Sequence, residues 1–334
     1  MRRLGQLLGG LSLGLAMAAC SDSGNNDPVD AGIVADLGTN ADGGVQNDTG
    51  VAQPDVGFNP DATVGPDSGS CLVETPPDPT PDPACTADWL TVVKGDLVRA
   101  GGGPIEDARA QLCLRTPNDV LRCLRPAATC ADGHFEIAVP EEARCVAHGA
   151  LRMLLPTGGY ATTYCELPVV NPPVVTLPSA LRLYATNPVA NLPPAGDLTA
   201  SRDINFEGGL VASLIPNDTY VEYGDLAARK IAAADPVPCF LEGQPAPDGL
   251  WAFSPEGDIV GDGAPLVIPN TTGLAAGSMV RLYVLGGLDC TLSDGTLVPE
   301  SEWREYGNAQ VSADGTVIEG ARLPCLTWFG YRAQ

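Results

Sequence analysis

The segment that decides the fold reads Asp132-Gly133-His134-Phe135-Glu136-Ile137-Ala138-Val139. Its apolar residues Phe135, Ile137 and Val139 recur with a period of two, which places their side chains on one face of a strand. Asp-Gly is a dipeptide that favours a tight turn, and here it stands directly before that strand. The segment therefore predicts a turn followed by a half-buried β-strand.

Short strand patterns broken by turns continue on both sides of this segment. Residues 160–164 are aromatic and β-branched, residues 145–154 alternate less cleanly, and Val280, Leu282 and Val284 alternate as inward positions. The further strand candidates are residues 181–185, 204–214, 238–241, 250–253, 266–269 and 325–331. Asp-Gly pairs typical of hairpin turns occur at residues 248–249, 262–263, 294–295 and 314–315, while residues 225–235 fit either a short helix or a strand. This spacing predicts an all-β fold of two β-sandwich domains that follow a disordered acidic linker.

Residues 85–175 resemble the carboxypeptidase regulatory-like domain, a transthyretin-like β-sandwich. The matching residues are Val92-Val93-Lys94-Gly95, Gly103-Pro104, Ala108, Gln111-Leu112-Cys113-Leu114, the most specific run Thr129 to Ile137, and Gly159-Tyr160. The resemblance implies a module that accompanies enzymes and surface proteins and is not itself catalytic. The extra cysteines of this region depart from the family pattern, and neither histidine is followed by Glu three residues on, as the zinc motif of the peptidase partner would require.

Residues 176–334 carry a second resemblance. The run from Trp251-Ala252-Phe253-Ser254-Pro255 through residues 265–269 to Leu274-Ala275 is similar to ZU5-like β-domains, which repeat a Ser-Pro and then an apolar strand ending in Pro. This resemblance implies a second β-sandwich of a structural or interaction type.

The composition limits the class of partner. The 334 residues include 41 acidic and 18 basic side chains, which give a formal net charge of −23. Nucleic-acid binding needs a basic surface, and docking on anionic lipid needs clusters of basic residues. The sequence therefore predicts that the protein binds neither of these partners through its charge. The 39 glycines and 31 prolines also make an all-α bundle improbable.

The first nineteen residues read as a signal peptide. Arg2 and Arg3 precede an uncharged apolar stretch from residue 4 to residue 19, which is too short for a membrane span. Ala18-Ala19-Cys20 resembles the lipobox of bacterial lipoproteins, which implies cleavage before Cys20 and its acylation, although Met17 stands where Leu is usual. Ordinary cleavage after Ala18 and twin-arginine export are the alternatives. Ser21 rather than Asp after the cysteine favours outer-membrane sorting.

Residues 20–84 are predicted to form a tether. Residues 21–70 contain nine Asp, no Glu, no Lys or Arg and one aromatic residue, a composition that cannot bury enough apolar surface to fold. Alternating prolines follow at positions 76, 77, 79, 81 and 83, which favour a stiff polyproline II spacer. Calcium binding by the aspartates is the alternative, but their spacing does not match an EF-hand loop.

The cysteine count predicts disulfide bonds. If Cys20 is acylated, ten cysteines remain, an even number suited to an oxidising compartment. These disulfide candidates are Cys71, Cys85, Cys113, Cys123, Cys130, Cys145, Cys165, Cys239, Cys290 and Cys325. Seven lie in residues 71–165 and three in residues 239–325, so complete pairing requires at least one bridge between the two regions.

Few residues suggest a site with chemistry of its own. Glu256, Asp258 and Asp262 group three carboxylates that either bind calcium or form a solvated hairpin end. Trp303 is the best candidate for an exposed aromatic residue that binds a ligand, whereas Trp328, flanked by apolar residues, is expected in the core. The two histidines, His134 and His148, are predicted to be non-catalytic.

These observations predict a non-enzymatic lipoprotein of the outer membrane or cell surface. It would contact the membrane through its lipid anchor and act as a binding, adhesion or structural module, with a cell-surface glycan or protein as the partner. The alternative function is an accessory or diverged secreted hydrolase that acts on polysaccharide or peptide. A calcium-stabilised surface module is the third hypothesis.

Overall fold

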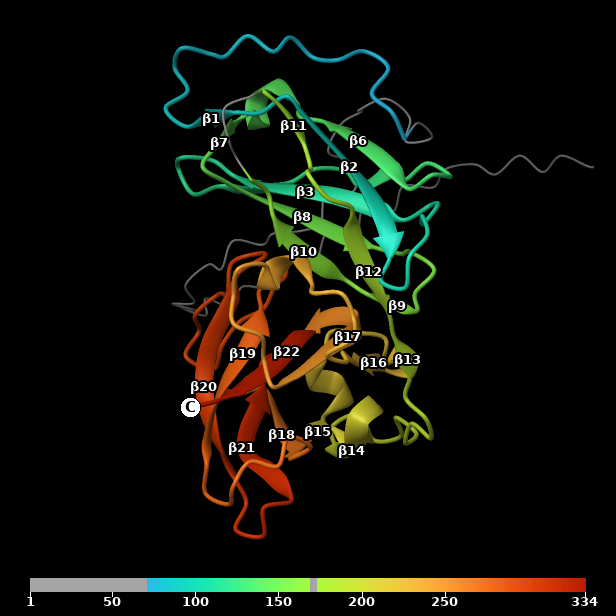
Figure 1. The fold of residues 1–334 in the computed structure, drawn as a ribbon, viewed down its shortest axis with the longest axis vertical. Helices are drawn as coiled ribbons and strands as arrows, with labels where there is room; N and C mark the ends of the chain where they lie inside the picture. Colours follow the sequence, from blue (N-terminus) through green and yellow to red (C-terminus); the bar gives the residue numbers. More distant parts are fainter. Residues whose placement is uncertain (1–70, 169–172) are drawn as a thin grey trace, which may run out of the picture. The chain divides into compact units, whose positions relative to one another are not determined.

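The computed structural model describes residues 71–168 and 173–334. The described residues all belong to one compact unit. The predicted signal peptide, Cys20 and the Asp-rich segment as far as residue 70 lie outside the described residues. The described residues form twenty-two β-strands interrupted by short 3-10 helices, so the all-β prediction is confirmed (Figure 1). None of the described helices has the length and apolar character needed to cross a membrane.

The first module is a β-sandwich of two five-stranded sheets and a small two-stranded one. One large sheet has the order β10-β8-β3-β4, and β5 also pairs with β3. The other has the order β11-β2-β12-β9, and β6 also pairs with β2. Its strands are β1 (Asp88–Trp89), β2 (Val92–Arg99), β3 (Arg109–Arg115), β4 (Leu121–Cys123), β5 (Ala127–Ala128), β6 (His134–Ala138), β7 (Cys145–Val146), β8 (His148–Leu154), β9 (Tyr160–Ala161), β10 (Thr163–Glu166), β11 (Val174–Thr176) and β12 (Leu181–Ala185), and η1 (Glu141–Ala143) is its 3-10 helix.

The segment that opened the sequence analysis forms β6 and its preceding turn. Gly133 has a φ of +84°, and its N–H donates to the carbonyl of Cys130. Phe135 and Ile137 are buried and pack in one cluster with Leu112 of β3 and other side chains of the facing sheet. Because full burial of a side chain of this size contributes about 1.5–3 kcal/mol, the alternation of this strand also fixes which of its faces meets the core.

The first module extends further along the chain than the sequence analysis placed it. Strand β12 was assigned to the second module, but it pairs in parallel with β2, where Leu181 lies opposite Leu97, and antiparallel with β9. β11 also pairs in parallel with β2. Alternation reveals which face of a strand is buried but carries no information about its partner, and parallel pairing joins residues that are far apart in sequence.

The proline-rich run is a loop rather than a linear spacer. Cys71 is bonded to Cys130 and Cys85 to Cys145, so both ends of the run are held on the first module. The backbone N–H of Val73 also donates to the carboxylate of Glu136 at 3.0 Å. Between these anchors the chain is mostly exposed and arches away from the sheets (Figure 1). The folded part of the chain therefore includes residues from Cys71 onward.

The second module is a single ten-stranded sheet with the order β13-β16-β17-β22-β19-β20-β21-β18-β15-β14. Its strands are β13 (Asn187–Pro188), β14 (Arg202–Asn205), β15 (Val211–Leu214), β16 (Ala227–Lys230), β17 (Gly249–Asp258), β18 (Ala264–Pro269), β19 (Met279–Leu285), β20 (Trp303–Val311), β21 (Val317–Leu323) and β22 (Cys325–Ala333), and its 3-10 helices are η2 (Glu207–Gly209), η3 (Pro216–Asp218), η4 (Tyr223–Asp225) and η5 (Cys239–Leu241).

This sheet folds over on itself to form a second sandwich. Phe206, directly after β14, packs edge-on against Phe253 of β17 with ring centroids 5.2 Å apart. The indole N–H of Trp251 in β17 donates to the carbonyl of Glu207 in η2 at 2.9 Å. Strands near opposite ends of the hydrogen-bonded order therefore face each other across one apolar cluster that includes side chains from β14 to β22.

Several local predictions for the second module need correction. Residues 239–241 form the 3-10 helix η5 instead of the predicted strand, because they follow the prolines at positions 236 and 238 and bury Phe240 and Leu241 without a strand partner in the sheet order. Residues 204–214 form two strands separated by η2. Of the two alternatives left open for residues 225–235, the strand is the one observed, over residues 227–230. The Asp314-Gly315 turn joins β20 and β21 as predicted, whereas Gly249 is the first residue of β17 and not a turn residue.

All ten cysteines from Cys71 to Cys325 are paired. The remaining bridges are Cys113–Cys123, Cys165–Cys239 and Cys290–Cys325. The Cys165–Cys239 bridge joins β10 of the first module to η5 of the second, so the inter-region bridge predicted from the odd counts is confirmed. Five disulfide bonds are typical of oxidising compartments, and the chain is therefore an extracellular or surface protein.

Candidate functional site

A buried polar network joins the two modules and contains Glu256, one of the predicted calcium ligands. The guanidinium of Arg152 in β8 donates to one Glu256 oxygen from Nε at 3.1 Å and from Nη2 at 2.9 Å. The Tyr164 hydroxyl donates a short hydrogen bond to the other oxygen, which also accepts the N–H of Leu288 at 3.3 Å. Burial, together with the negative charge of Glu256, raises the pKa of Tyr164 well above its usual value. Glu256 is thus saturated by protein partners.

The other two predicted calcium ligands do not complete a site. Asp258 ends β17 and lies opposite Cys325, and burial raises the pKa of its carboxyl. Asp262 is exposed in the turn before β18, where its carbonyl accepts a hydrogen bond from Arg322 at 2.7 Å. No group of three potential metal ligands is found within residues 71–168 and 173–334. The structure thus assigns Glu256 to the module joint and does not bring the three carboxylates together as a metal centre.

Further contacts complete the joint between the modules. Arg115 pairs with Glu300 at 3.1 Å, and the Glu300 side chain is only 1% exposed. The indole N–H of Trp328 donates to the carbonyl of Thr162 at 2.8 Å, and Trp328 itself is fully buried, as predicted. With the Cys165–Cys239 bridge, the joint therefore combines covalent, ionic and aromatic contacts, which is the construction expected of a fixed rather than a hinged connection.

A candidate ligand-binding surface is the outer face of β22, β19 and β20, which lie side by side (Figure 1). On β19, Val280, Leu282 and Val284 point inward and are buried, as predicted. The alternate residues therefore point outward. The register places outward residues of the neighbouring strands beside them. We call this surface the binding face, and its residues are Met279, Arg281, Tyr283, Trp303, Glu305, Asn308, Gln310 and Arg332.

Trp303 stands at one end of the binding face, in a small aromatic pocket. Its ring is nearly parallel to that of Tyr283, with centroids 5.8 Å apart and an interplanar angle of 12°, and lies 5.2 Å from the ring of Phe240. The indole lies over Gly330 of β22, where an added Cβ would come within 3.1 Å of the ring. The pocket encloses about 70 Å³ and is lined by Gln244, Pro245, Pro247, Tyr283, Trp303 and Arg332. Trp303, predicted as an exposed ligand-binding residue, is partly exposed in this pocket.

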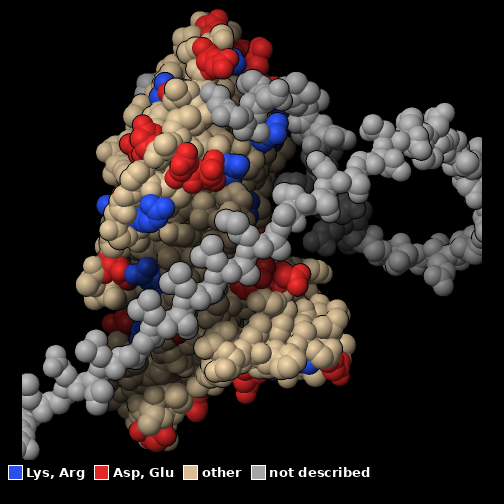
Figure 2. Space-filling model, turned by 90° about the vertical axis from the view of Figure 1, so that its right-hand side faces the viewer, with Lys and Arg blue, Asp and Glu red and all other residues tan. Residues whose placement is uncertain are grey.

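Arg332 supplies positive charge to the aromatic pocket. Its guanidinium carbon lies 5.2 Å from the centroid of the Tyr283 ring, and Nη2 donates to the Tyr283 hydroxyl at 2.7 Å. Its neighbour Arg281 is paired with Glu305 at 3.3 Å. Among the described residues, no carboxylate forms an ion pair with Arg332. On the face seen in Figure 2, several basic residues lie beside acidic ones, whereas others have no acidic neighbour.

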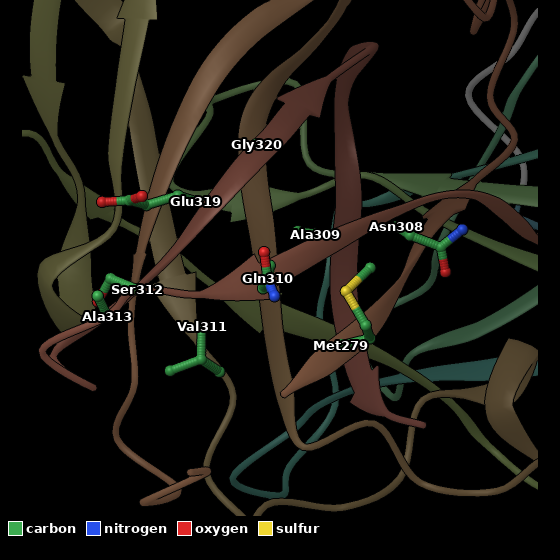
Figure 3. Close-up of a pocket in the computed structure, with 9 residues that line it drawn as sticks. All are labelled: Met279, Asn308, Ala309, Gln310, Val311, Ser312, Ala313, Glu319 and Gly320. Atoms are coloured by element: carbon green, nitrogen blue, oxygen red, sulfur yellow. The ribbon is translucent and has the colours of Figure 1, made fainter. Parts of the chain in front are cut away.

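A larger hollow lies at the other end of the binding face, with a volume of about 480 Å³ (Figure 3). Gln310 lies between Met279 and Glu319 in this view, which agrees with the register, because Gln310 is the strand partner of both. Asn308 and Ser312 complete its polar lining. Two amides, a hydroxyl and a carboxylate supply hydrogen-bonding groups to this hollow, and the apolar part of its lining comes from Met279, Ala309, Val311 and Ala313.

The larger hollow exists because β20 and β21 diverge after a short contact. The two strands pair only at Gln310 with Glu319 and at Val311 with Ile318. The pairing of β21 with β18 shifts register beside Gly320, whose φ of +84° is that of a bulge residue. Sequence reasoning missed this hollow, because neither the divergence nor the bulge has a pattern of its own.

The two histidines lie away from the binding face. His134 on β6 contacts Asp96 at 2.9 Å, and this hydrogen bond is the main reason why its pKa is raised. Glu136 lies 3.6 Å from its other ring nitrogen and is itself paired with Lys94 at 2.6 Å. His148 opens β8 opposite Arg115, beside the module joint.

Comparison with known proteins gives only distant likenesses. No protein-family model matches the chain, and no curated protein matches it. Among solved structures it is similar to a Streptococcal ancillary pilin, at 13% sequence identity and a TM-score of 0.20, with 73% of this chain and 53% of the pilin covered. The major pilin subunit BcpA of Bacillus cereus gives 11% identity and a TM-score of 0.18, with 70% and 85% covered. The chain thus spans about half the length of the ancillary pilin.

Proposed function

We propose that this protein is an exported lipoprotein that binds an extracellular ligand on the outer face of β22, β19 and β20. The observation that carries the proposal is the pocket formed by Trp303, Tyr283 and Arg332. It places a partly exposed indole beside a guanidinium that has no carboxylate partner among the described residues. Aromatic side chains with a few convergent polar groups are typical of ligand sites.

Anchoring through Cys20 is part of this proposal. The ten other cysteines are paired, so Cys20 has no disulfide partner left and is available for acylation. The Asp-rich segment would then connect the lipid to the folded modules, and the first module would serve as a carboxypeptidase regulatory-like support. A ZU5-like origin of the second module would agree with an interaction role.

We favour binding over hydrolysis because of the state of the carboxylates near the pocket. A glycosidase needs two carboxyl groups that are free to exchange protons across one bond. Glu305 is ion-paired with Arg281 and accepts a hydrogen bond from the Tyr283 hydroxyl at 3.2 Å. An accessory or diverged hydrolase remains the second candidate, because Glu319 borders the same face.

A binding screen with matched variants tests the proposed function. The purified mature protein is offered to arrays of polysaccharides and of peptides, and each ligand found is titrated against Trp303→Ala and Arg332→Gln. Both substitutions are expected to weaken binding roughly five- to 150-fold, because an aromatic contact and a charge-assisted hydrogen bond each contribute about 1–3 kcal/mol. Tyr220→Ala is the control, since Tyr220 is an aromatic residue that is 71% exposed and lies outside the binding face.

Two results would contradict this function. One is binding that is unchanged in Trp303→Ala and Arg332→Gln although both variants remain folded. The other is release of reducing sugar or of new peptide ends from the ligand by the wild-type protein, lost in Glu319→Gln, which would establish the hydrolase instead.

A further inference from the structure

We infer that the ligand is an acidic polysaccharide bound as an extended chain, which runs along the binding face from the Trp303 pocket to the Gln310 hollow. This inference rests on the proposed function and goes beyond it in the class of ligand and in the length of the site. Its basis is that the two hollows belong to one continuous surface.

The strand register places both hollows on the same side of the sheet. Tyr283, Arg281 and Met279 alternate along β19 and point to the outer side, and Tyr283 borders one hollow while Met279 borders the other. Four residues of an antiparallel strand span about 14 Å. A ligand that fills both hollows must therefore be an elongated molecule and not a single small one.

Polar side chains occupy the surface between the two hollows. Arg281 lies opposite Asn308 on β20 and opposite Arg332 on β22. The Asn308 side-chain oxygen accepts a hydrogen bond from the Gln334 amide, which aligns its own amide group on the outer side. No large apolar side chain interrupts this row. Amides and guanidinium groups suit the many hydroxyls of a sugar chain, and the indole at one end suits the apolar face of a sugar ring.

The backbone of the binding face favours a polysaccharide over a peptide. β19 is paired along its length with β20 on one edge and with β22 on the other. An extended peptide gains much of its affinity by adding a strand to a free edge, which β19 does not offer. A sugar chain needs only side chains, and these are what the binding face presents.

The charge at the aromatic end selects an acidic sugar. Arg332 is held against Tyr283 by its hydrogen bond, so its position is fixed before a ligand arrives. Arg332 is one of several described arginines without an ion pair, but it is the one that lines the aromatic pocket, where a ligand carboxylate can bind it without displacing a protein carboxylate. A carboxylated sugar at the Trp303 pocket would form the bidentate contact that arginine favours.

A length ladder of acidic oligosaccharides tests the inference. Oligogalacturonates and alginate oligomers of two to eight sugars are titrated against the mature protein, with neutral malto-oligosaccharides and a proline-rich peptide as comparisons. We expect affinity for at least one acidic ladder to rise until the chain spans both hollows and then to level off. Gln310→Ala and Asn308→Ala should each weaken the longest oligomer about fivefold, the loss of one or two hydrogen bonds, and leave the dimer unchanged. Asn217→Ala, a substitution at an exposed asparagine away from the face, should change neither.

The possible failures separate the two proposals. If binding requires Trp303 but is independent of length and of Gln310, the extended site is wrong while the binding function stands. If only the neutral oligosaccharides or only the peptide bind through Trp303, the acidic class is wrong. If Trp303→Ala and Arg332→Gln change no binding at all, the proposed function fails together with this inference.

Discussion

The ion pair between Arg152 and Glu256 offers the sharpest test of how the two modules are held together. The substitution Glu256→Gln keeps the size of the side chain and an oxygen that can accept from Tyr164 and Leu288, but it removes the negative charge. The Arg152 guanidinium would then remain in the joint, where its side chain is only 20% exposed, without its counter-charge.

The size of the expected loss in stability follows from the burial of the Arg152–Glu256 ion pair. Removal of one partner from a buried ion pair costs about 3–5 kcal/mol, because the other charge is left uncompensated. Arg152 retains its hydrogen bond to the Gln111 side chain and some contact with solvent, so we expect a loss near the lower limit, about 3 kcal/mol. For a chain of this size, that loss corresponds to a fall in Tm of roughly 6–12 °C.

Thermal unfolding followed by circular dichroism, with the disulfide bonds intact, measures this effect. The double variant Arg152→Met/Glu256→Gln should be more stable than Glu256→Gln alone, because it also removes the guanidinium charge that Glu256→Gln leaves without a counter-ion. The control is Glu305→Gln, whose partner Arg281 is 46% exposed and whose loss should cost less than about 1 kcal/mol. A Tm for Glu256→Gln within 2 °C of the wild type, or a double variant less stable than the single one, would refute the reasoning.

Three further predictions concern other parts of the fold. Because Asp96 raises the pKa of His134, the charged imidazole stabilises the fold fully below its unfolded pKa near 6.5, and this stabilisation is lost as the pH rises through the higher folded value; His134→Gln should therefore lower the Tm more at pH 5.5 than at pH 8.5. Joint replacement of Cys165 and Cys239 by serine should lower the free energy of unfolding by about 3 kcal/mol in urea titrations, and an unchanged midpoint would contradict a structural role for the bridge. Tyr306→Phe should cost about 1 kcal/mol in the same assay, since it removes the hydrogen bond to the Arg322 carbonyl.

The parts of the fold that depend on local pattern could be predicted from the sequence. Alternation identified the buried face of β6 and of β19, because a strand that buries one side repeats with a period of two whatever its partner is. The Asp314-Gly315 turn was predicted for a similar reason, since a residue with a φ of +74° favours glycine. The bridge between the modules followed from counting cysteines, which needs no geometry.

The parts that depend on partners distant in sequence could not be predicted. Nothing near Glu256 in the sequence indicates that Arg152, 104 residues earlier, is its counter-ion, so the sequence left only two alternatives for the three neighbouring carboxylates, a calcium site or a solvated hairpin end. The assignment of β12 to the first module and the approach of Phe240 to Trp303 have the same origin. Trp303 was predicted as an exposed ligand-binding residue, but the pocket around it is completed by residues from β19, β22 and the loop after η5, which the sequence does not place beside it.

The joint between the modules and the binding face share a structural element, and this links stability to binding. Phe240, which packs against Trp303, directly follows Cys239, and Cys239 is bonded to Cys165 of the first module. Phe240 also packs against the buried Trp328, whose indole is hydrogen-bonded to Thr162. One wall of the aromatic pocket is therefore held by the same contacts that hold the modules together. A site fixed in this way loses little side-chain entropy when a ligand is bound, so a protein that uses this pocket gains affinity from a rigid joint and not only from the residues that touch its ligand.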